Sequence, residues 1–186
     1  LKNETNPIFK LDIDQKRPLE EYFLDAGITT ETIISRDINS LEVFNCLEQL
    51  NCEVIIYSGY GGGIIGKRLL GIDKKFLHVH GGYLPDYPGS TTNYFSILKE
   101  DKVGASAIFL NEDIDRGPIL YRVSLDPPIQ KNYMDHQFDG CIRAYALFKT
   151  MEAYSKNKSW QYFDPSEIKN HYFKIHPVLK HLAILK

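Results

Sequence analysis

The sequence predicts an α/β domain built around a doubly wound, mainly parallel sheet. Segments with helical spacing of apolar residues alternate with short, continuously apolar segments along most of the chain. Such alternation is typical of βαβ units, in which helices connect parallel strands. The 186 residues are enough for one domain with a sizeable core. The composition, 43% hydrophobic and 25% charged, is that of an ordinary globular domain.

The first part of the chain is weakly patterned until about residue 18. We expect residues 1–17 to form a loop, an arm or a degraded strand. Proline suits the first position of a helix and glycine suits its end. Apolar spacing and these end signals predict, in order, a helix from Pro18 to Gly27, a strand over 31–35, and a helix capped by Asp37 or Asn39 that reaches Leu50.

The remaining elements alternate more clearly. They are a strand over 54–57, a helix over 65–70, a strand over 76–80, a helix over 91–98, strands over 105–110 and 119–124, and a long helix over 138–154. The segment 54–57 is apolar throughout, which favours a strand buried on both faces of a parallel sheet. We therefore predict a core domain over 18–156, with 157–186 as an extension packed on it.

A glycine cluster follows the strand at 54–57. It consists of Gly59, Tyr60, Gly61, Gly62 and Gly63. It matches neither the phosphate-binding pattern GxxxxGK[ST] nor the dinucleotide pattern GxGxxG. Two interpretations stay open: a loop whose bare backbone approaches a flat ligand, or a flexible turn between a strand and a helix.

Two histidines end the strand over 76–80. His78 and His80 are two residues apart, so both side chains are expected on one face of the strand. Carboxylates that could complete a site are available in loops, at Asp86, Glu112, Asp113 and Asp115. One interpretation is acid–base catalysis, with a carboxylate that orients an imidazole. The other is a metal site with two histidines and one carboxylate. The spacing does not separate them.

Charge and cysteine content limit the partners. The net charge is −2 and lysines and arginines are scattered, which argues against a nucleic-acid partner. The three cysteines, Cys46, Cys52 and Cys141, lack the spacing of a disulfide framework or a zinc site, so we expect reduced thiols in a cytoplasmic protein. No apolar run approaches the ~20 residues of a membrane helix, so no membrane partner is expected.

Two blocks of sequence resemble the folate-dependent formyltransferases, a family that includes glycinamide ribonucleotide transformylase, methionyl-tRNA formyltransferase and the sugar N-formyltransferases. The family signature is Asn-x-His, a few small or apolar residues, Leu-Pro and then Gly. Residues 76–90 resemble it, with His80, Leu84-Pro85 and Gly89 at the matching positions. Residues 103–120 resemble the strand-loop-strand that contains an Asp-x-Gly, here Asp115 and Gly117. The resemblance covers about 18–154 and implies the Rossmann-like formyltransferase fold.

The resemblance implies a reaction and the residues that perform it. The family transfers a formyl group from 10-formyltetrahydrofolate to an amine through a tetrahedral intermediate. Carried over by position, His80 is the catalytic histidine, Asp115 is the catalytic aspartate, and His78 stands where the family has asparagine. A neutral imidazole N–H at that position could donate to the oxyanion.

The resemblance also implies where the donor binds. Its site would be formed by two loops: Gly59, Tyr60, Gly61, Gly62, Gly63 and Ile64 in one, and Asn111, Glu112, Asp113 and Ile114 in the other. We expect a small amine as the acceptor, with an amino sugar on a nucleotide as the preferred choice. Two alternatives remain: a non-catalytic folate- or nucleotide-binding relative, and a metal-dependent hydrolase that uses His78, His80 and Asp115.

The family begins with a strand, a helix and a strand before the segment that resembles Pro18 onward. Only 17 residues precede Pro18 here. The resemblance therefore implies that the first strand-helix unit is missing: either the chain is truncated, with 1–17 as the remnant of that unit, or the domain is abbreviated. An exposed sheet edge would invite pairing with another chain, so a homodimer is included among the expected partners.

Overall fold

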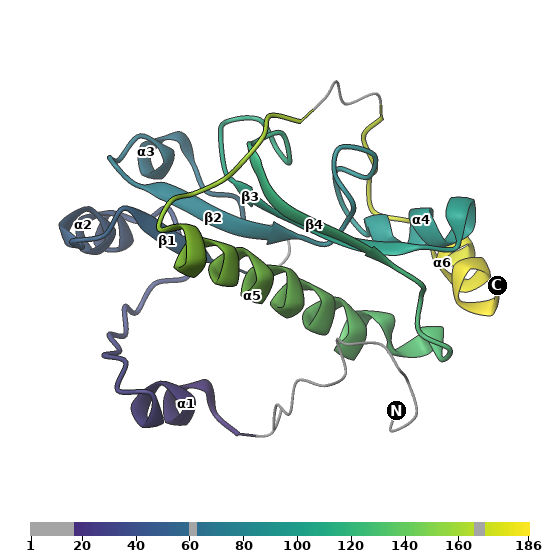
Figure 1. Cartoon of the computed structure of the whole chain (residues 1–186), viewed down its shortest axis with the longest axis horizontal. Coiled ribbons are helices and arrows are strands. Elements are labelled where there is room, and N and C mark those ends of the chain that lie inside the picture. The colour runs from purple at the N-terminus through teal and green to yellow at the C-terminus, as the bar shows by residue number, and fades with distance from the viewer. Residues whose placement is uncertain (1–16, 60–62, 166–169) are drawn as a thin grey trace. The chain divides into compact units, whose positions relative to one another are not determined.

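The computed structural model describes residues 17–59, 63–165 and 170–186 (Figure 1). The chain divides into two compact units, Leu1–Leu50 and Asn51–Lys186. Most of the predicted N-terminal arm, residues 1–16, lies outside the described residues.

The first unit contains α1 (Leu19–Asp25) and α2 (Leu41–Gln49), close to the predicted helices. Gly27 takes a φ of 67° just after α1, a left-handed conformation that suits glycine at a helix end. The cap of α2 differs from the prediction: the Val43 N–H donates to Ser40 Oγ at 3.4 Å, in place of a cap at Asp37 or Asn39.

The strand predicted over 31–35 is wrong. These residues form no strand, and the Ile34 side chain is 97% exposed. A short extended segment is stabilised by pairing with a neighbouring strand, and the described part of the chain provides none for it.

The second unit holds a four-stranded sheet in the order β1-β2-β3-β4. Its strands are β1 (Val54–Tyr57), β2 (Lys75–His80), β3 (Val103–Phe109) and β4 (Ile119–Leu125). Strand β1 runs parallel to β2, whereas the pairs β2–β3 and β3–β4 are antiparallel. The α/β class is confirmed, but the sheet is mixed and not mainly parallel.

The strand directions follow from the connections. Helix α4 (Thr92–Glu100) lies between β2 and β3 in the sequence, and β3 starts at the end of the sheet where β2 stops, so the chain does not cross back before β3. The loop 110–118 between β3 and β4 is shorter than the crossover of roughly a dozen residues that parallel neighbours need.

Burial also corrects one prediction about the sheet. Strand β3 is buried at every residue, whereas β1 is an edge strand of the described sheet and its Ile56 is 47% exposed. The apolar run 54–57 therefore does not mark a strand buried on both faces. Helix α5 (Asp139–Asn157) packs along the sheet and buries Ile142, Ala146 and Thr150 (Figure 1).

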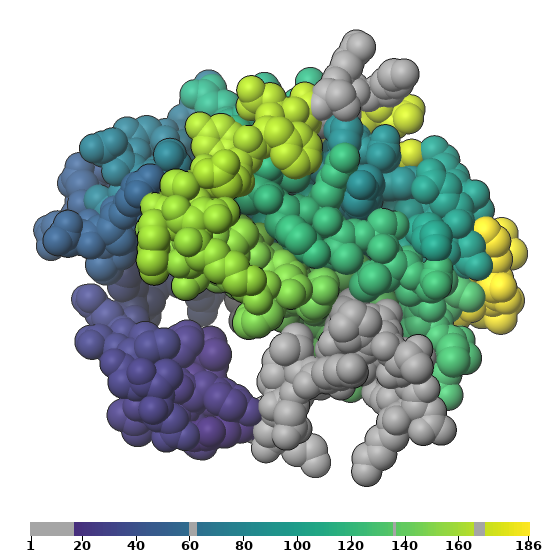
Figure 2. Space-filling model, viewed as in Figure 1, coloured from purple at the N-terminus to yellow at the C-terminus, as the bar shows by residue number. Residues whose placement is uncertain are grey.

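The chain after α5 returns across the sheet. Trp160 stacks on Tyr154 and meets the Phe109 ring edge-on, and this segment covers part of the face shown in Figure 2. The last helix, α6 (Pro177–Leu185), packs against α4. This helix lies in the stretch 157–186, for which the sequence predicted an extension without naming a helix.

The loop after β2 is fixed by a buried hydroxyl. Ser106 of β3 accepts a hydrogen bond from the Leu84 N–H at 2.9 Å and donates one to the Gly82 carbonyl at 2.8 Å. Ser106 is fully buried, so both backbone groups depend on it and not on water. The ends of β2 and of this loop, where the site lies, are therefore held in place.

The same loop is held from outside by residues near the C-terminal end. The Tyr172 N–H donates to the Pro88 carbonyl at 3.0 Å, and the Ser90 N–H donates to the Tyr172 carbonyl at 2.8 Å. Gly89 has a φ of 106°, and a Cβ there would lie 2.0 Å from the backbone carbonyl oxygen of Tyr172. Only glycine allows this approach.

All three cysteines are free. Among the described residues, no helix combines the length and the apolar character needed to cross a membrane.

Candidate active site

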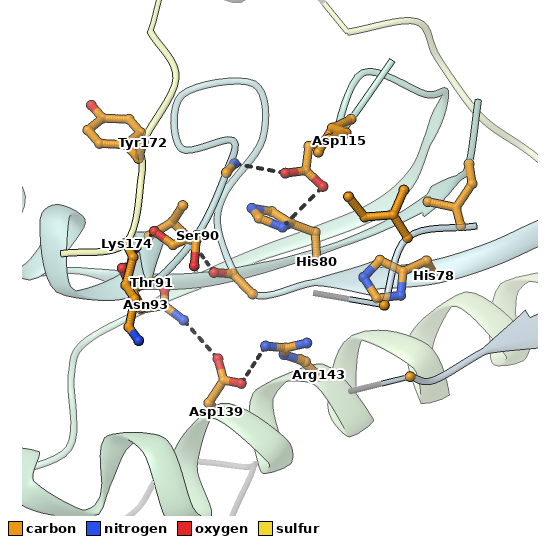
Figure 3. Close-up of a pocket in the computed structure, with 18 of the residues that line it drawn as sticks. His78, His80, Ser90, Thr91, Asn93, Asp115, Asp139, Arg143, Tyr172 and Lys174 are labelled. Carbon is orange, nitrogen blue, oxygen red and sulfur yellow. Dashed lines mark hydrogen bonds and ion pairs between the residues drawn. The ribbon is translucent and has the colours of Figure 1, made fainter. Parts of the chain in front are cut away.

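A cavity of about 860 Å³ opens beyond the carboxyl end of β2 (Figure 3). Its walls come from the end of β2, the loop after β1, the loop 110–118, the start of α4, the start of α5 and the segment 171–174. This volume lies in the range of small-molecule sites.

The cavity brings together the site residues predicted from the sequence. Those that line it are Gly59, Gly63, Ile64, His78, His80, Asn111, Glu112, Asp113, Ile114 and Asp115. Three further predicted residues, Tyr60, Gly61 and Gly62, lie outside the described residues. Segments separated by about fifty residues thus meet around one space.

His80 and Asp115 form a buried pair. The imidazole Nδ1 lies 3.4 Å from Asp115 Oδ1, and the two side chains are 8% and 10% exposed. The second oxygen of Asp115 accepts a hydrogen bond from the Gly89 N–H at 2.8 Å. The Asp115 backbone is in the left-handed conformation, with a φ of 57°. The other ring nitrogen of His80, Nε2, donates to the Tyr87 carbonyl at 2.8 Å. Both nitrogens of His80 therefore face groups of the protein.

His78 is in a different situation. Its Nδ1 lies 3.1 Å from the Tyr57 carbonyl, which can only accept, so Nδ1 carries the hydrogen. Burial lowers the pKa of His78, the Tyr57 carbonyl opposes this, and His80 and Arg143 lower the pKa further against a smaller effect of Asp115. The neutral ring is thus favoured at neutral pH.

The wall formed by α5 was missed by the sequence interpretation. Arg143 Nη2 lies 2.7 Å from Asp139 Oδ2, one turn earlier on the helix. Asn93 of α4 donates to Asp139 at 3.4 Å and accepts the Gly104 N–H at 2.7 Å. A Cβ on Gly81 would lie 2.8 Å from Asp139 and 2.9 Å from Arg143, so glycine there lets this pair approach the end of β2. The only sequence signal was an acid and a base four residues apart on one helix.

The loop after β1 is folded back on its own strand. The Tyr57 hydroxyl donates to the Gly63 carbonyl at 3.0 Å, and a Cβ on Gly59 would lie 2.1 Å from that hydroxyl. On the facing side, Lys67 forms an exposed ion pair with Glu112 at 2.6 Å. The helix that follows the glycine loop is therefore linked to the loop at 111–114 by a surface contact.

The residues at 171–174 complete the cavity, and no sequence signal could have placed them there. The Tyr172 ring stacks on Tyr87 with centroids 5.4 Å apart. Lys174 and Phe173 also line the space. These side chains form part of the cavity wall.

The geometry does not favour the metal-dependent alternative. The described residues contain no group of three or more His, Cys, Asp or Glu side chains placed to hold a metal ion. His80 has no nitrogen directed away from its protein partners, so it could not share an ion with His78 without leaving Tyr87 or Asp115.

A family model described as formyl transferase matches residues 6–137. The chain belongs to the formyl transferase family. Methionyl-tRNA formyltransferase from Finegoldia magna is 32% identical over 151 residues, which is 79% of this chain and 46% of the relative. This formyl transferase family member spans about half or less of the length of the curated relatives it matches.

Solved structures of formyltransferases share the fold of this family member. Methionyl-tRNA formyltransferase from Clostridium thermocellum superposes with a TM-score of 0.59 at 17% identity, over 86% of this chain and 67% of that one. WlaRD, a sugar 3N-formyl transferase in the presence of dTDP and 5-N-formyl-THF, gives a TM-score of 0.54 at 18% identity, over 87% of this chain and 56% of that one. The predicted Rossmann-like formyltransferase fold is confirmed.

Proposed function

We propose that this protein transfers a formyl group from 10-formyltetrahydrofolate to a primary amine in the cavity at the end of β2. The observation that carries the proposal is the meeting of His78, His80 and Asp115 beside this cavity, in a chain of the formyl transferase family. The cavity is lined by imidazole, carboxylate and guanidinium groups.

The residues around the cavity suit a folate donor. A pterin is a flat heteroaromatic ring system whose faces pack on apolar groups and whose edges carry hydrogen-bond donors and acceptors. The exposed side chains of Ile64 and Ile114 line the cavity near backbone that carries no bulky side chain, at Gly59 and Gly63. Apolar faces with a few polar groups are what such ligands require. The structure of WlaRD in the presence of dTDP and 5-N-formyl-THF supports the same donor class for this chain.

The chemistry places two demands on the protein. When the amine attacks the formyl carbon, negative charge develops on the formyl oxygen and a proton must leave the nitrogen. A positioned donor stabilises the first, and a general base of suitable pKa accepts the second. Both kinds of group lie within this one cavity.

A nucleotide-linked amino sugar is our proposed acceptor. The net charge of −2 does not favour a polyanionic partner such as tRNA, and WlaRD, described as a sugar 3N-formyl transferase, supports the sugar class. Methionyl-tRNA is the second candidate, because the curated relatives are methionyl-tRNA formyltransferases.

A transfer assay tests the proposal. The protein is incubated with 10-formyltetrahydrofolate and, separately, with a dTDP-linked amino sugar, methionyl-tRNA and free glycine, and each formamide is measured by mass spectrometry. We expect product with the sugar alone. Product with methionyl-tRNA alone would replace the acceptor and keep the reaction. If a folded protein binds folate and formylates no amine, the non-catalytic alternative is correct.

A further inference from the structure

His80, the histidine that the family resemblance makes catalytic, has no ring nitrogen available to a substrate. Its Nε2 is 2.8 Å from the Tyr87 carbonyl, and a carbonyl can only accept, so this nitrogen carries a hydrogen. Its Nδ1 faces Asp115, and the residue is 6% exposed. To take a proton from an amine, the ring would have to leave one of these partners.

His78 offers what His80 lacks. Its only N–H in the neutral form is bound to the Tyr57 carbonyl, so the other nitrogen, Nε2, carries a lone pair. Among the groups that the structure describes, the only hydrogen bond of the His78 side chain is the one from Nδ1 to Tyr57, and the half-buried ring lines the cavity. The ring therefore presents an acceptor to the cavity, not the N–H donor that the sequence analysis expected at the position of the family asparagine.

Arg143 supplies the donor that His78 does not provide. One of its nitrogens is bound to Asp139, and its Nε is buried without a hydrogen-bond partner among the described residues. A guanidinium has five N–H groups in a fixed plane, so donors remain after the pair with Asp139 is formed. In Figure 3, dashed lines join Arg143 to Asp139 and His80 to Asp115, and Arg143 and His78 both line the same cavity.

We propose that, within the formyl-transfer reaction inferred above, His78 accepts the proton of the attacking amine and Arg143 stabilises the oxyanion. His80 and Asp115 then act as positioning residues that hold the loop 81–90. The proposal rests on the proposed function and assigns its chemical steps to particular side chains.

Formyl transfer begins when the amine lone pair forms a bond to the formyl carbon. The C=O π electrons move onto the formyl oxygen, which is bound by Arg143. His78 Nε2 takes one proton from the new ammonium. The oxygen electrons then restore the C=O bond, the bond from carbon to N10 of the folate breaks, and N10 receives the proton from His78. The products are a formamide and tetrahydrofolate, and His78 is neutral again.

The charged groups around His78 are consistent with this role. The groups that act on the His78 ring are His80 on the same strand, Arg143 on α5, Asp115 in the loop 110–118 and the Tyr57 carbonyl of β1. Burial and the two cationic or titratable neighbours keep the ring neutral, which is the form that accepts a proton.

The tautomers can be measured without any substrate. Nitrogen-15 NMR of the imidazole rings is recorded against pH for the wild type, with His78→Gln and His80→Gln to assign the signals. We expect His78 to be neutral near pH 7 with its hydrogen on Nδ1, and to titrate below the ordinary value of about 6.5. A hydrogen on Nε2 of neutral His78 would overturn the proposal.

The pH dependence of kcat assigns the base. It is measured from about pH 5 to about pH 8 with a dTDP-linked amino sugar, or with methionyl-tRNA if that is the acceptor found. His78→Asn, which restores the family residue, should lose at least ~100-fold in kcat and lose the wild-type acidic limb. His80→Gln keeps a donor for Tyr87, so it should lose only about 10-fold and retain the limb.

The opposite pattern, a limb kept in His78→Asn and lost in His80→Gln, would make His80 the base and overturn the inference. Failure of the wild type to formylate any acceptor would instead overturn the proposed function, and with it the catalytic role. The NMR result would then still report the tautomers by themselves.

Discussion

The two histidines of β2 stand in opposite surroundings although they are two residues apart. Around His80 the polar atoms are matched by polar neighbours within the protein: Nε2 donates to the Tyr87 carbonyl, Nδ1 lies 3.4 Å from Asp115 Oδ1, and the other Asp115 oxygen accepts the Gly89 N–H. Around His78 and Arg143, each side chain retains a nitrogen without a partner among the described groups. The matched region has the character of a structural support, and the unmatched region has the character of a reaction centre.

Loss of the guanidinium should produce the largest effect. We expect Arg143→Gln to lower kcat by roughly 100- to 1000-fold, about 3 to 4 kcal/mol, because a donor to the oxyanion is removed. Arg143→Lys should recover part of this loss. Lys149→Gln, on the same helix and paired with Glu152, is the control and should leave kcat unchanged. A wild-type rate in Arg143→Gln would show that Arg143 does not stabilise the oxyanion, and it would contradict a reaction centre at His78 and Arg143.

Substitutions at Asp115 test whether the buried pair of His80 and Asp115 has a structural role. Asp115→Ala should lower the free energy of unfolding by about 3 kcal/mol, because the Gly89 N–H loses its acceptor and alanine must take a left-handed backbone. Asp115→Asn keeps an acceptor oxygen and tolerates that backbone, so it should cost less than about 1 kcal/mol. Denaturation in urea measures both. Equal stability of the two variants would contradict the support role.

Substitution of Ser106 tests whether its two hydrogen bonds stabilise the loop 81–90 after β2. Ser106→Ala leaves the buried Leu84 N–H and Gly82 carbonyl without their partner, and should cost about 2 kcal/mol. The matched control is Ser124→Ala, at an exposed position of β4, which should stay within about 0.5 kcal/mol of the wild type. If the two substitutions cost the same, the loop is not held by Ser106.

The effect of pH on stability should be the smallest of these changes. The folded state holds the pKa of His78 below its value of about 6.5 in the unfolded chain, so the unfolded chain binds more protons in this range. The stability that neutral His78 contributes to the folded state is therefore fully present above about pH 6.5, and it is lost as the pH falls toward the lower pKa of His78 in the folded protein. Each pH unit in that window costs up to about 1.4 kcal/mol. Urea denaturation should show a weaker acid dependence in His78→Asn than in the wild type, and an identical dependence would refute the assignment.

The same contrast explains what the sequence could predict. The segments that end in His80 and Asp115 carry local signals, namely strand patterns, Leu-Pro and Asp-x-Gly, so the strands and loops that line one side of the cavity were placed correctly. The local pattern 31–35 failed because a strand also needs a partner, and none lies beside it within the described residues.

Other features depend on distant parts of the chain. The mixed sheet follows from the end at which β3 enters, which the helical pattern of α4 does not encode. Arg143 reaches the end of β2 because Gly81 lets it approach, and Tyr172 reaches Gly89 across more than eighty residues. The tautomer of His78 depends on the Tyr57 carbonyl of a neighbouring strand. Periodicity carries no information about such pairings.

Binding of the folate donor is the most direct test of the account. Calorimetry with 5-formyltetrahydrofolate would compare the wild type with Ile114→Asp and Ile129→Asp, two exposed isoleucines of which only Ile114 lines the cavity. We predict binding to the wild type, a loss of at least ~10-fold in affinity for Ile114→Asp, since a carboxylate would be buried against the ligand, and no change for Ile129→Asp. Absence of binding by the folded wild type, or equal affinity of the two variants, would contradict a folate site in this cavity.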